Sequence, residues 1–370
     1  MTLTDTSPAA GEVSADRFME DSVMKILIIG LGGIGQRHAR NLRTLLGQDV
    51  ELIAYRVRAL SHVVTAQLEL DRTRSVEEEL GIESFRDLAA ALRQKPDAAF
   101  ICNPSSLHIP IALECANAGC DLFLEKPISN TLDGIDELIE IVQAKKLIGM
   151  VGFQLRFHPA IRAMATLLKE RVVGGPIAVR ATVGEYLPNF HRYEDYRSGY
   201  AARSDLGGGV LLTQIHEFDY LYSLFGLPSQ LFAMGGHWSD LEIDVEDTAS
   251  ILMQCSMDGR QLPVHLHQDY LQNPPSRRCE ILTEWGKIEA DFPSLSVTVT
   301  DRKTGSQTIK SFPNFDRNRM FLDETQQFLD CLRTREQPSI TLQDGAQSLR
   351  MALAAKQSIA TGKLVSIAEI

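Results

Sequence analysis

Short apolar runs alternate with longer amphipathic stretches over the first part of the chain. The apolar runs predict buried strands at 25–29, 50–55, 98–102, 121–124 and 148–152, and a shorter strand near 82–85. Helical patterns follow the first strand as far as Leu46 and recur at 87–94, 107–118 and 132–145. Strands that alternate with helices of this length indicate βαβ units. We therefore predict a doubly wound parallel sheet for this part of the chain.

The pattern changes after Gly152. A helix at 159–170 and a strand at 177–183 lead into a long polar and aromatic loop, and loops of that length are usually functional. A single helix is expected at 209–225, then strands with hairpin turns as far as Ser311, then two amphipathic helices. The prominent side chains of the loop are Tyr186, His191, Tyr193, Tyr196, Arg197, Tyr200 and Arg203.

A glycine-rich segment follows the first strand directly. Gly30, Gly32 and Gly35 have the GxGxxG spacing: the first glycine makes a tight turn, the second lets the backbone approach a pyrophosphate, and the third lets helix and strand pack closely. The amino end of the helix then faces the phosphates. Because this segment lies between a buried strand and a helix, it predicts a dinucleotide site that contains Gly30, Gly32, Gly33, Ile34 and Gly35.

These patterns together predict an α/β chain with two folded domains. Residues 1–23 lack an apolar period and are expected to form a flexible tail. Residues 24–152 are expected to form an N-terminal Rossmann domain with a doubly wound parallel sheet. Residues 153–370 are expected to form a C-terminal α+β domain for substrate binding and oligomerisation. The sheet of this second domain should be open and mainly antiparallel. Its last helices could pack back on the first domain.

Composition narrows the classes of function. The 370 residues are 44% hydrophobic and 23% charged, which suits two domains with separate cores. A net charge of −11 without a Lys/Arg-rich run argues against a nucleic-acid partner and against an acidic membrane surface. No apolar run approaches the roughly 20 residues of a membrane span, and the chain start lacks a signal-peptide pattern. The six cysteines form no CxxC pair, which favours a reducing, cytoplasmic setting.

The end of the second strand bears on the identity of the dinucleotide. It reads Ala54-Tyr55-Arg56-Val57-Arg58, where an NAD-binding chain would carry an acidic residue for the ribose 2′-hydroxyl. The two guanidinium groups could instead bind a 2′-phosphate through charge-assisted hydrogen bonds. We therefore predict NADP or NAD, with a preference for NADP, and place Tyr55 and Arg56 in the cofactor site. The alternative is that Arg56 stacks on the adenine or lies in solvent.

Two further strand ends carry polar residues. The segment 103–108 borders the same crevice, so Asn103, Pro104, Ser105 and His108 are predicted to touch the ribose or nicotinamide. Alternatively, or in addition, Ser105 is the N-cap of the next helix. The apolar run at 121–124 ends in Glu125-Lys126-Pro127, and charges at the carboxyl end of such a strand usually face the ligand crevice. Lys126 is the first candidate for acid–base chemistry, with a surface lysine after an edge strand as the alternative.

Four motifs of the chain resemble the Gfo/Idh/MocA oxidoreductase family in their order along the chain and in their spacing. The resemblance extends over nearly all of residues 24–367. It implies a nicotinamide cofactor, which Glu125 and Lys126 help to bind, and a sugar, cyclitol or related substrate. It implies that the open sheet of the second domain forms a homodimer or homotetramer. It also implies that Lys126 serves as, or assists, the general acid/base, that His216 binds or polarises the substrate hydroxyl, and that Pro127 follows a cis peptide. The four motifs are Gly30 to Gly35 with Arg37-His38, the segment 103–108, Glu125-Lys126-Pro127, and the segment 207–219.

This chain departs from the family pattern beside His216. Many family dehydrogenases have an Asp three or four residues before that histidine, whereas these positions hold Thr213 and Leu212 here. Thr213 can form a hydrogen bond but cannot carry a negative charge. On a helix, Asp219 would share the face of His216 and Glu217 would not. The carboxylate that would tune the imidazole is therefore expected to be missing or replaced.

Several other residues are candidates for ligand binding. Arg156 and Arg203 could anchor a carboxylate or phosphate of the substrate through paired N–H donors, and salt bridging within the protein is the alternative. His265 and His267 alternate on one strand face, but no third ligand is spaced nearby, so no metal is predicted.

The combined prediction is an NAD(P)-dependent oxidoreductase that moves a hydride between nicotinamide and a hydroxyl or carbonyl carbon. In this mechanism Lys126 takes or returns the hydroxyl proton, and the Glu125 carboxylate should point away from the amine. The alternatives are a dinucleotide-sensing regulatory protein without catalysis, and an enzyme that recycles a tightly bound cofactor internally.

Overall fold

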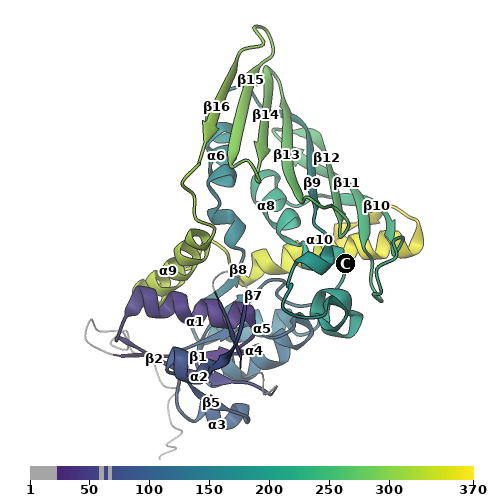
Figure 1. Ribbon diagram of the computed structural model, residues 1–370. Helices are drawn as coiled ribbons and strands as arrows, with labels where there is room; N and C mark the ends of the chain where they lie inside the picture. The colour runs from purple at the N-terminus through teal and green to yellow at the C-terminus, as the bar shows by residue number, and fades with distance from the viewer. Residues whose placement is uncertain (1–22, 58–61, 66–68) are drawn as a thin grey trace, which may run out of the picture.

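The computed structural model describes residues 23–57, 62–65 and 69–370, so Arg58 and residues 1–22 of the predicted tail lie outside the described residues. The lower part of the molecule in Figure 1 is a six-stranded parallel sheet with the order β5-β2-β1-β6-β7-β8. The strand order reverses between β1 and β6, which is where doubly wound sheets bind ligands. The predicted Rossmann architecture is confirmed. The strands are β1 (Met24–Ile29), β2 (Val50–Tyr55), β5 (Glu83–Phe85), β6 (Ala98–Ile101), β7 (Asp121–Glu125) and β8 (Gly149–Gly152).

The predicted helices around this sheet are present with small shifts at their ends, whereas helix α2 (Val76–Leu80) was not predicted. Helix α5 begins at Ile135, because Gly134 before it adopts a left-handed conformation with φ of 74°. Strands β3 and β4 form a separate two-stranded ribbon that the apolar pattern did not predict, since β4 is mostly polar. The remaining bounds are α1 (Gly33–Leu46), β3 (His62–Val64), β4 (Leu70–Ser75), α2 (Val76–Leu80), α3 (Leu88–Leu92), α4 (His108–Asn117) and α5 (Ile135–Ala144).

The upper part is a nine-stranded sheet with the order β16-β15-β14-β13-β9-β12-β11-β10-β17. The β9–β12 pair is parallel and the other neighbouring pairs are antiparallel, so the prediction of a mainly antiparallel sheet is confirmed. The strands are β9 (Pro176–Gly184), β10 (Gln230–Gly236), β11 (Thr248–Met257), β12 (Arg260–Asp269), β13 (Ser276–Thr283), β14 (Gly286–Asp291), β15 (Ser296–Asp301), β16 (Gln307–Ser311) and β17 (Val365–Ser366).

Helices cover one face of this sheet, namely α6 (Pro159–Lys169), α8 (His216–Phe225) and α10 (Leu342–Thr361). The prediction of one helix at 209–225 is wrong, because the chain forms a short α7 (Val210–Thr213) and then turns before α8. The break occurs where main-chain carbonyls bind other partners: Thr213 O accepts from Lys126 Nζ at 2.9 Å, and Gln214 O accepts from Gln268 Nε2 at 2.7 Å. The turn therefore joins α8 to the strand end that carries Lys126.

The last two long helices contact both parts of the molecule (Figure 1). Helix α9 (Asn318–Thr334) lies beside α1, where Arg37 Nη1 donates to Asn318 Oδ1 at 3.1 Å. After α9, both guanidinium Nη atoms of Arg335 bind the Asp121 carboxylate at 2.7 and 2.9 Å. The six cysteines are buried free thiols. No helix among the described residues is long and apolar enough to cross a membrane.

Candidate active site

The glycine loop has the close contacts that its spacing predicted. Gly30 has φ of +90°, and a Cβ placed there would lie 3.2 Å from the backbone nitrogen of Asn103. A Cβ on Gly35 would lie 2.0 Å from the carbonyl oxygen of Gly30, so no larger residue fits without a backbone shift. Helix α1 begins at Gly33, which leaves the N–H groups of its first turn directed at the crevice. The loop can therefore cradle the phosphates of a dinucleotide.

The end of β2 carries an ion pair that the sequence did not predict. The Arg56 guanidinium pairs with the carboxylate of Glu77 in α2. Glu77 also accepts hydrogen bonds from Ser75 Oγ at 3.2 Å and Ser84 Oγ at 3.1 Å. An acidic group is thus present near the end of β2, although it comes from a later helix and not from the strand itself.

The turn after β6 combines an unpaired amide with two structural contacts. Both polar atoms of the Asn103 side chain are buried without a partner among the described residues, which suits hydrogen bonding to a bound ribose or nicotinamide. Ser105 Oγ is not an N-cap; it lies 3.3 Å from Leu206 O in the second domain. The His108 ring nitrogens lie 2.9 Å from Pro127 O and 2.8 Å from Asn103 O, so this ring ties the two strand-end turns together.

Lys126 extends from the carboxyl end of β7 towards the second domain. Its amine donates to Thr213 O at 2.9 Å, and the peptide that follows it is cis, as the resemblance implied. The Glu125 carboxylate is turned the other way, with Oε1 2.6 Å from Nε2 of the fully buried His38 and Oε2 3.2 Å from the main-chain nitrogen of Lys126. The amine is therefore fixed by a neutral carbonyl, and the carboxylate lies in the Rossmann core.

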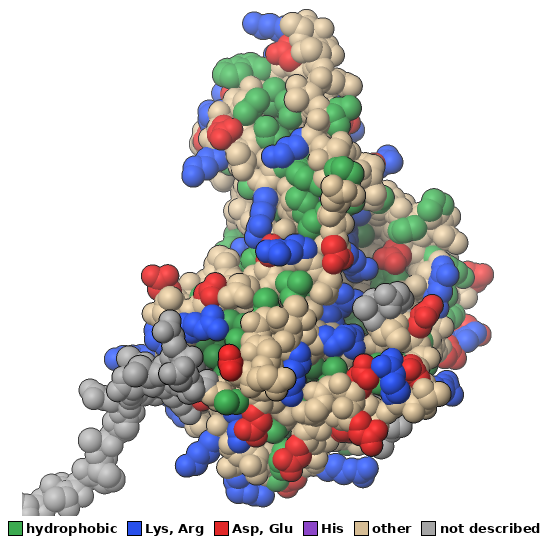
Figure 2. Space-filling view, turned by 60° about the vertical axis from the view of Figure 1, so that its left-hand side comes forward, with side chains coloured by type: hydrophobic (Ala, Val, Ile, Leu, Met, Phe, Trp, Pro, Cys, Tyr) green, Lys and Arg blue, Asp and Glu red, His purple; other side chains and the backbone are tan. Residues whose placement is uncertain are grey.

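His216 lies at the start of α8 in a buried and cationic environment. Burial, and after it the charges of Lys126, Arg277 and Arg317, holds the pKa of the imidazole well below its usual range. The ring is therefore neutral at neutral pH. Its Nε2 lies 3.1 Å from the amide nitrogen of Gln154, and its Nδ1 has no partner among the described residues. On the face drawn in Figure 2, Lys and Arg side chains gather along the junction of the two parts of the molecule.

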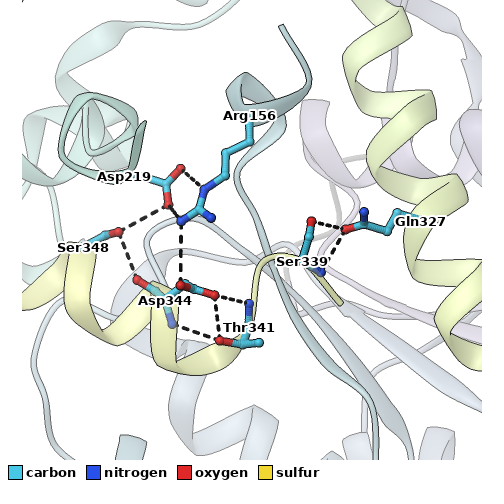
Figure 3. Close-up of polar contacts among 7 residues, drawn as sticks. All are labelled: Arg156, Asp219, Gln327, Ser339, Thr341, Asp344 and Ser348. Carbon is cyan, nitrogen blue, oxygen red and sulfur yellow. Dashed lines mark hydrogen bonds and ion pairs between the residues drawn. The ribbon is translucent and has the colours of Figure 1, made fainter. Parts of the chain in front are cut away.

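The carboxylates closest in sequence to His216 bind arginines. Arg156 donates from Nε and Nη2 to the two Asp219 oxygens, at 2.9 and 2.7 Å (Figure 3). Ser348 Oγ, in α10, lies 3.4 Å from the same carboxylate. Burial raises the pKa of Asp219 to about 6, and the Arg156 charge opposes that rise. Glu217 pairs with Arg277 at 2.9 Å. Neither carboxylate replaces the Asp that the family pattern has beside the histidine.

The other predicted ligand residues lie in simpler surroundings. Arg203 forms a bidentate ion pair with Asp205, two residues along the exposed loop, at 2.9 and 2.7 Å. His265 Nε2 lies 2.9 Å from Ser250 Oγ, and His267 Nε2 lies 3.2 Å from Asp269 Oδ2. Among the described residues no group of His, Cys, Asp and Glu could hold a metal ion.

Two family models match the parts of the chain that hold this site. Residues 24–153 match a model described as an oxidoreductase family with an NAD-binding Rossmann fold, and residues 161–289 match the GFO/IDH/MocA C-terminal domain. The chain belongs to the Gfo/Idh/MocA oxidoreductase family. Its first domain is accordingly an NAD(H)-binding Rossmann domain.

Relatives from this family match the chain over most of its length. Myo-inositol 2-dehydrogenase of Thermotoga maritima is 27% identical over 94% of this chain and 99% of its own length. The scyllo-inositol 2-dehydrogenase (NAD(+)) of Bacillus subtilis is 25% identical over 94% and 97%. The crystal structure of scyllo-inositol dehydrogenase from Lactobacillus casei, with NAD(H) and scyllo-inositol, has a TM-score of 0.72 at 24% identity. It covers 94% of this chain and 100% of its own.

Four residues of this Gfo/Idh/MocA site contact predicted site residues or their neighbours, and the sequence patterns did not indicate these contacts. His38, Gln154, Arg277 and Glu77 each contact a predicted site residue or its neighbour across a long sequence separation. His38 appeared in the sequence only as part of a motif, and nothing in its neighbourhood indicated that it would meet Glu125. Such pairs carry no local signal, because the contact depends on how separate elements pack.

Proposed function

We propose that the chain catalyses reversible hydride transfer between a nicotinamide dinucleotide and a hydroxyl-bearing carbon of a cyclitol, sugar or sugar derivative. The observation that carries the proposal is the position of the Lys126 amine. It lies at the carboxyl edge of the Rossmann sheet, donates to Thr213 O at 2.9 Å, and shares the crevice with the neutral His216. The inositol dehydrogenases among the relatives support the substrate class.

The contacts of Lys126 suit it to proton transfer. An ammonium group has three N–H donors, and one of them is directed at Thr213 O. No other hydrogen-bond partner of this nitrogen lies among the described residues, so the neutral amine can accept the hydroxyl proton while its orientation stays fixed. The bound cofactor supplies the hydride acceptor or donor. Glu125 does not compete for the amine, because its carboxylate lies against His38 at 2.6 Å.

His216 is proposed to orient the substrate oxygen. When the Gln154 amide donates to Nε2, the single proton of the neutral ring lies on Nδ1, which has no partner among the described residues. Nδ1 can then donate a hydrogen bond to the substrate hydroxyl or carbonyl oxygen. For Arg156 and Arg203, the internal pairs with Asp219 and Asp205 favour the salt-bridge alternative over substrate anchoring.

The test of the function is an absorbance assay at the reduced-nicotinamide band with a panel of cyclitols, sugars, sugar acids and sugar nucleotides. We expect turnover with at least one member of the first two classes. Tight NAD binding without turnover on the whole panel would favour the regulatory alternative. A cofactor that co-purifies and is reduced by substrate without release would favour internal recycling.

We propose NAD as the preferred cofactor, with Glu77 as the residue that limits NADP. The ion pair with Glu77 occupies Arg56, and the carboxylate would repel a 2′-phosphate. The Glu77→Gln variant is therefore expected to bind NADP about five- to tenfold more tightly with little change for NAD. Isothermal titration calorimetry measures both affinities. Glu79→Gln, which removes a carboxylate that pairs with Arg74 at 2.7 Å, is the control; equal shifts for the two dinucleotides would contradict the assignment.

We also propose that the open face of the nine-stranded sheet mediates self-association, as the family resemblance implies. Met234 in β10, Leu252 in β11 and Leu282 in β13 are exposed at 61%, 55% and 37%. Apolar side chains gathered on one uncovered face favour contact with a second copy. A monomeric mass in multi-angle light scattering would contradict this proposal.

A further inference from the structure

The long loop between β9 and α7 reaches from the second domain to both sides of the cofactor crevice. Near its end, Ser105 Oγ lies 3.3 and 3.4 Å from the carbonyl oxygens of Leu206 and Gly207. Near its middle, the Tyr193 hydroxyl lies against the glycine loop: a Cβ placed on Gly33 would be 2.9 Å from Tyr193 Oη. The loop is thus in contact with the turn after β6 and with the turn after β1.

The place where Tyr193 meets the first domain is the start of α1. Gly33 is the first residue of that helix, and the helix starts without a side-chain cap hydrogen bond. Unpaired N–H groups at such a helix start bind the pyrophosphate in Rossmann domains. The phenol oxygen is therefore next to the position where the phosphates must lie. The Tyr193 oxygen lies 2.9 Å from the Cβ position of Gly33, whereas the nearest side chain of the first domain, that of Val64, lies 3.8 Å from it.

The surroundings of Tyr193 keep its hydroxyl protonated. Burial, and after it the charge of Glu194, raises the pKa of Tyr193 to about 12. The His191 ring lies 5.4 Å from the Tyr193 ring, centroid to centroid, and His191 Nδ1 lies 3.2 Å from a Glu194 oxygen. These contacts hold the tip of the loop together. A protonated phenol at this position is a hydrogen-bond donor, which is what an anionic phosphate requires.

We propose that Tyr193 is a cofactor ligand, which donates from the second domain to the pyrophosphate of the bound nicotinamide dinucleotide. This inference rests on the proposed function only for the identity of the ligand. Glycine at position 33 leaves room for the phenol, since a Cβ there would lie 2.9 Å from the Tyr193 oxygen. A ligand role for Tyr193 also accounts for the length of the loop, which closes the crevice over the phosphates while Ser105 anchors its other end.

The test compares Tyr193→Phe with the unchanged chain in equilibrium binding, so it does not depend on turnover. NAD and ADP-ribose contain the pyrophosphate, and adenosine lacks it. We expect about tenfold weaker binding of NAD and ADP-ribose and no change for adenosine, which is measured by displacement. Tyr196→Phe is the matched control, because its hydroxyl lies in the same loop and accepts from the Glu242 N–H at 3.2 Å. That variant should bind all three ligands normally.

Three results would overturn the proposal. Unchanged affinities would show that the hydroxyl does not reach the phosphates. Tighter binding of NAD and ADP-ribose would show that the hydroxyl obstructs them. Equal weakening for all three ligands would show that the phenylalanine disturbs the loop as a whole. If the unchanged chain binds ADP-ribose but turns over no substrate, the proposed catalytic function fails while the role of Tyr193 is still measurable.

Discussion

Replacing Lys126 with alanine is expected to lower kcat by about 10²- to 10⁴-fold, which is the usual contribution of a positioned general acid or base. NAD binding should change by less than about threefold, because the phosphates and the adenosine lie away from the amine. Activity is lost because the alanine has no amine. Among the described residues, Lys126 is the side chain that Thr213 O holds at this point of the crevice. Steady-state kinetics with the substrate found in the panel, together with calorimetric NAD binding, measure both quantities.

The matched control for this variant is Lys145→Ala. The Lys145 amine also donates to a main-chain carbonyl, that of Asn117 at 2.6 Å, but it lies on the surface after α5. Loss of a lysine–carbonyl contact alone should therefore leave kcat unchanged. Turnover by Lys126→Ala within about threefold of the unchanged chain would rule out the acid–base role.

The second large effect is expected from Arg156→Met. This substitution leaves the fully buried Asp219 carboxylate without its cationic partner, and breaking a buried pair in this way typically costs about 3–5 kcal/mol of stability at neutral pH. Since Asp219 and His216 both lie in the first turn of α8, activity should fall as well where the variant is partly unfolded. Urea unfolding followed by circular dichroism measures the stability difference.

The pH dependence of this loss has a defined sign. The pKa of Asp219 is raised to about 6 in the folded protein, above its ordinary value of 3.8. A raised carboxyl pKa means that stability falls as the pH rises from the unfolded value to the folded one. Without Arg156 the folded pKa rises further, so the deficit of the variant should be small near pH 4 and large at pH 8. A deficit that is the same at both pH values would mean that lost packing, and not charge, is responsible.

Two further variants separate charge from packing. Adding Asp219→Asn to Arg156→Met removes the unpaired charge and should restore a large part of the stability at pH 8. Arg203→Met removes a guanidinium that forms an equally short bidentate pair with Asp205, but in an exposed loop where water screens the charges. It should change the unfolding midpoint little.

The comparison of these two arginines shows what the sequence could and could not predict. Both follow apolar residues and look alike as anchors for an anion. Their difference is burial: the Arg156 side chain is 16% exposed and that of Arg203 is 42% exposed. Burial depends on α8 and α10, which approach Arg156 from distant parts of the chain. The local sequence pattern therefore indicated two candidate anion-binding arginines but not the partners of either one.

The Rossmann fold, whose carboxyl edge holds the candidate site, could be predicted because its signals are local. The glycines, the strand end at Lys126 and the turn after β6 each lie within one βαβ unit, and strand order then brings them to one edge. Glu77 shows the limit of this reasoning. The sequence prediction considered a carboxylate only at the end of β2 itself. In the structure the carboxylate that pairs with Arg56 belongs to Glu77 in α2, further along the chain. The break between α7 and α8 was missed because both segments have helical periodicity.

The contact between β8 and the segment before α10 has a consequence for folding. Val151 N donates to Ile340 O at 3.2 Å, Met150 bridges to Thr341, and a Cβ on Gly345 would lie 2.7 Å from Val151 Cγ2. Among the described residues, the edge strand of the first sheet thus gains its outer neighbour from the segment that precedes α10. The two domains are accordingly expected to melt as one cooperative unit.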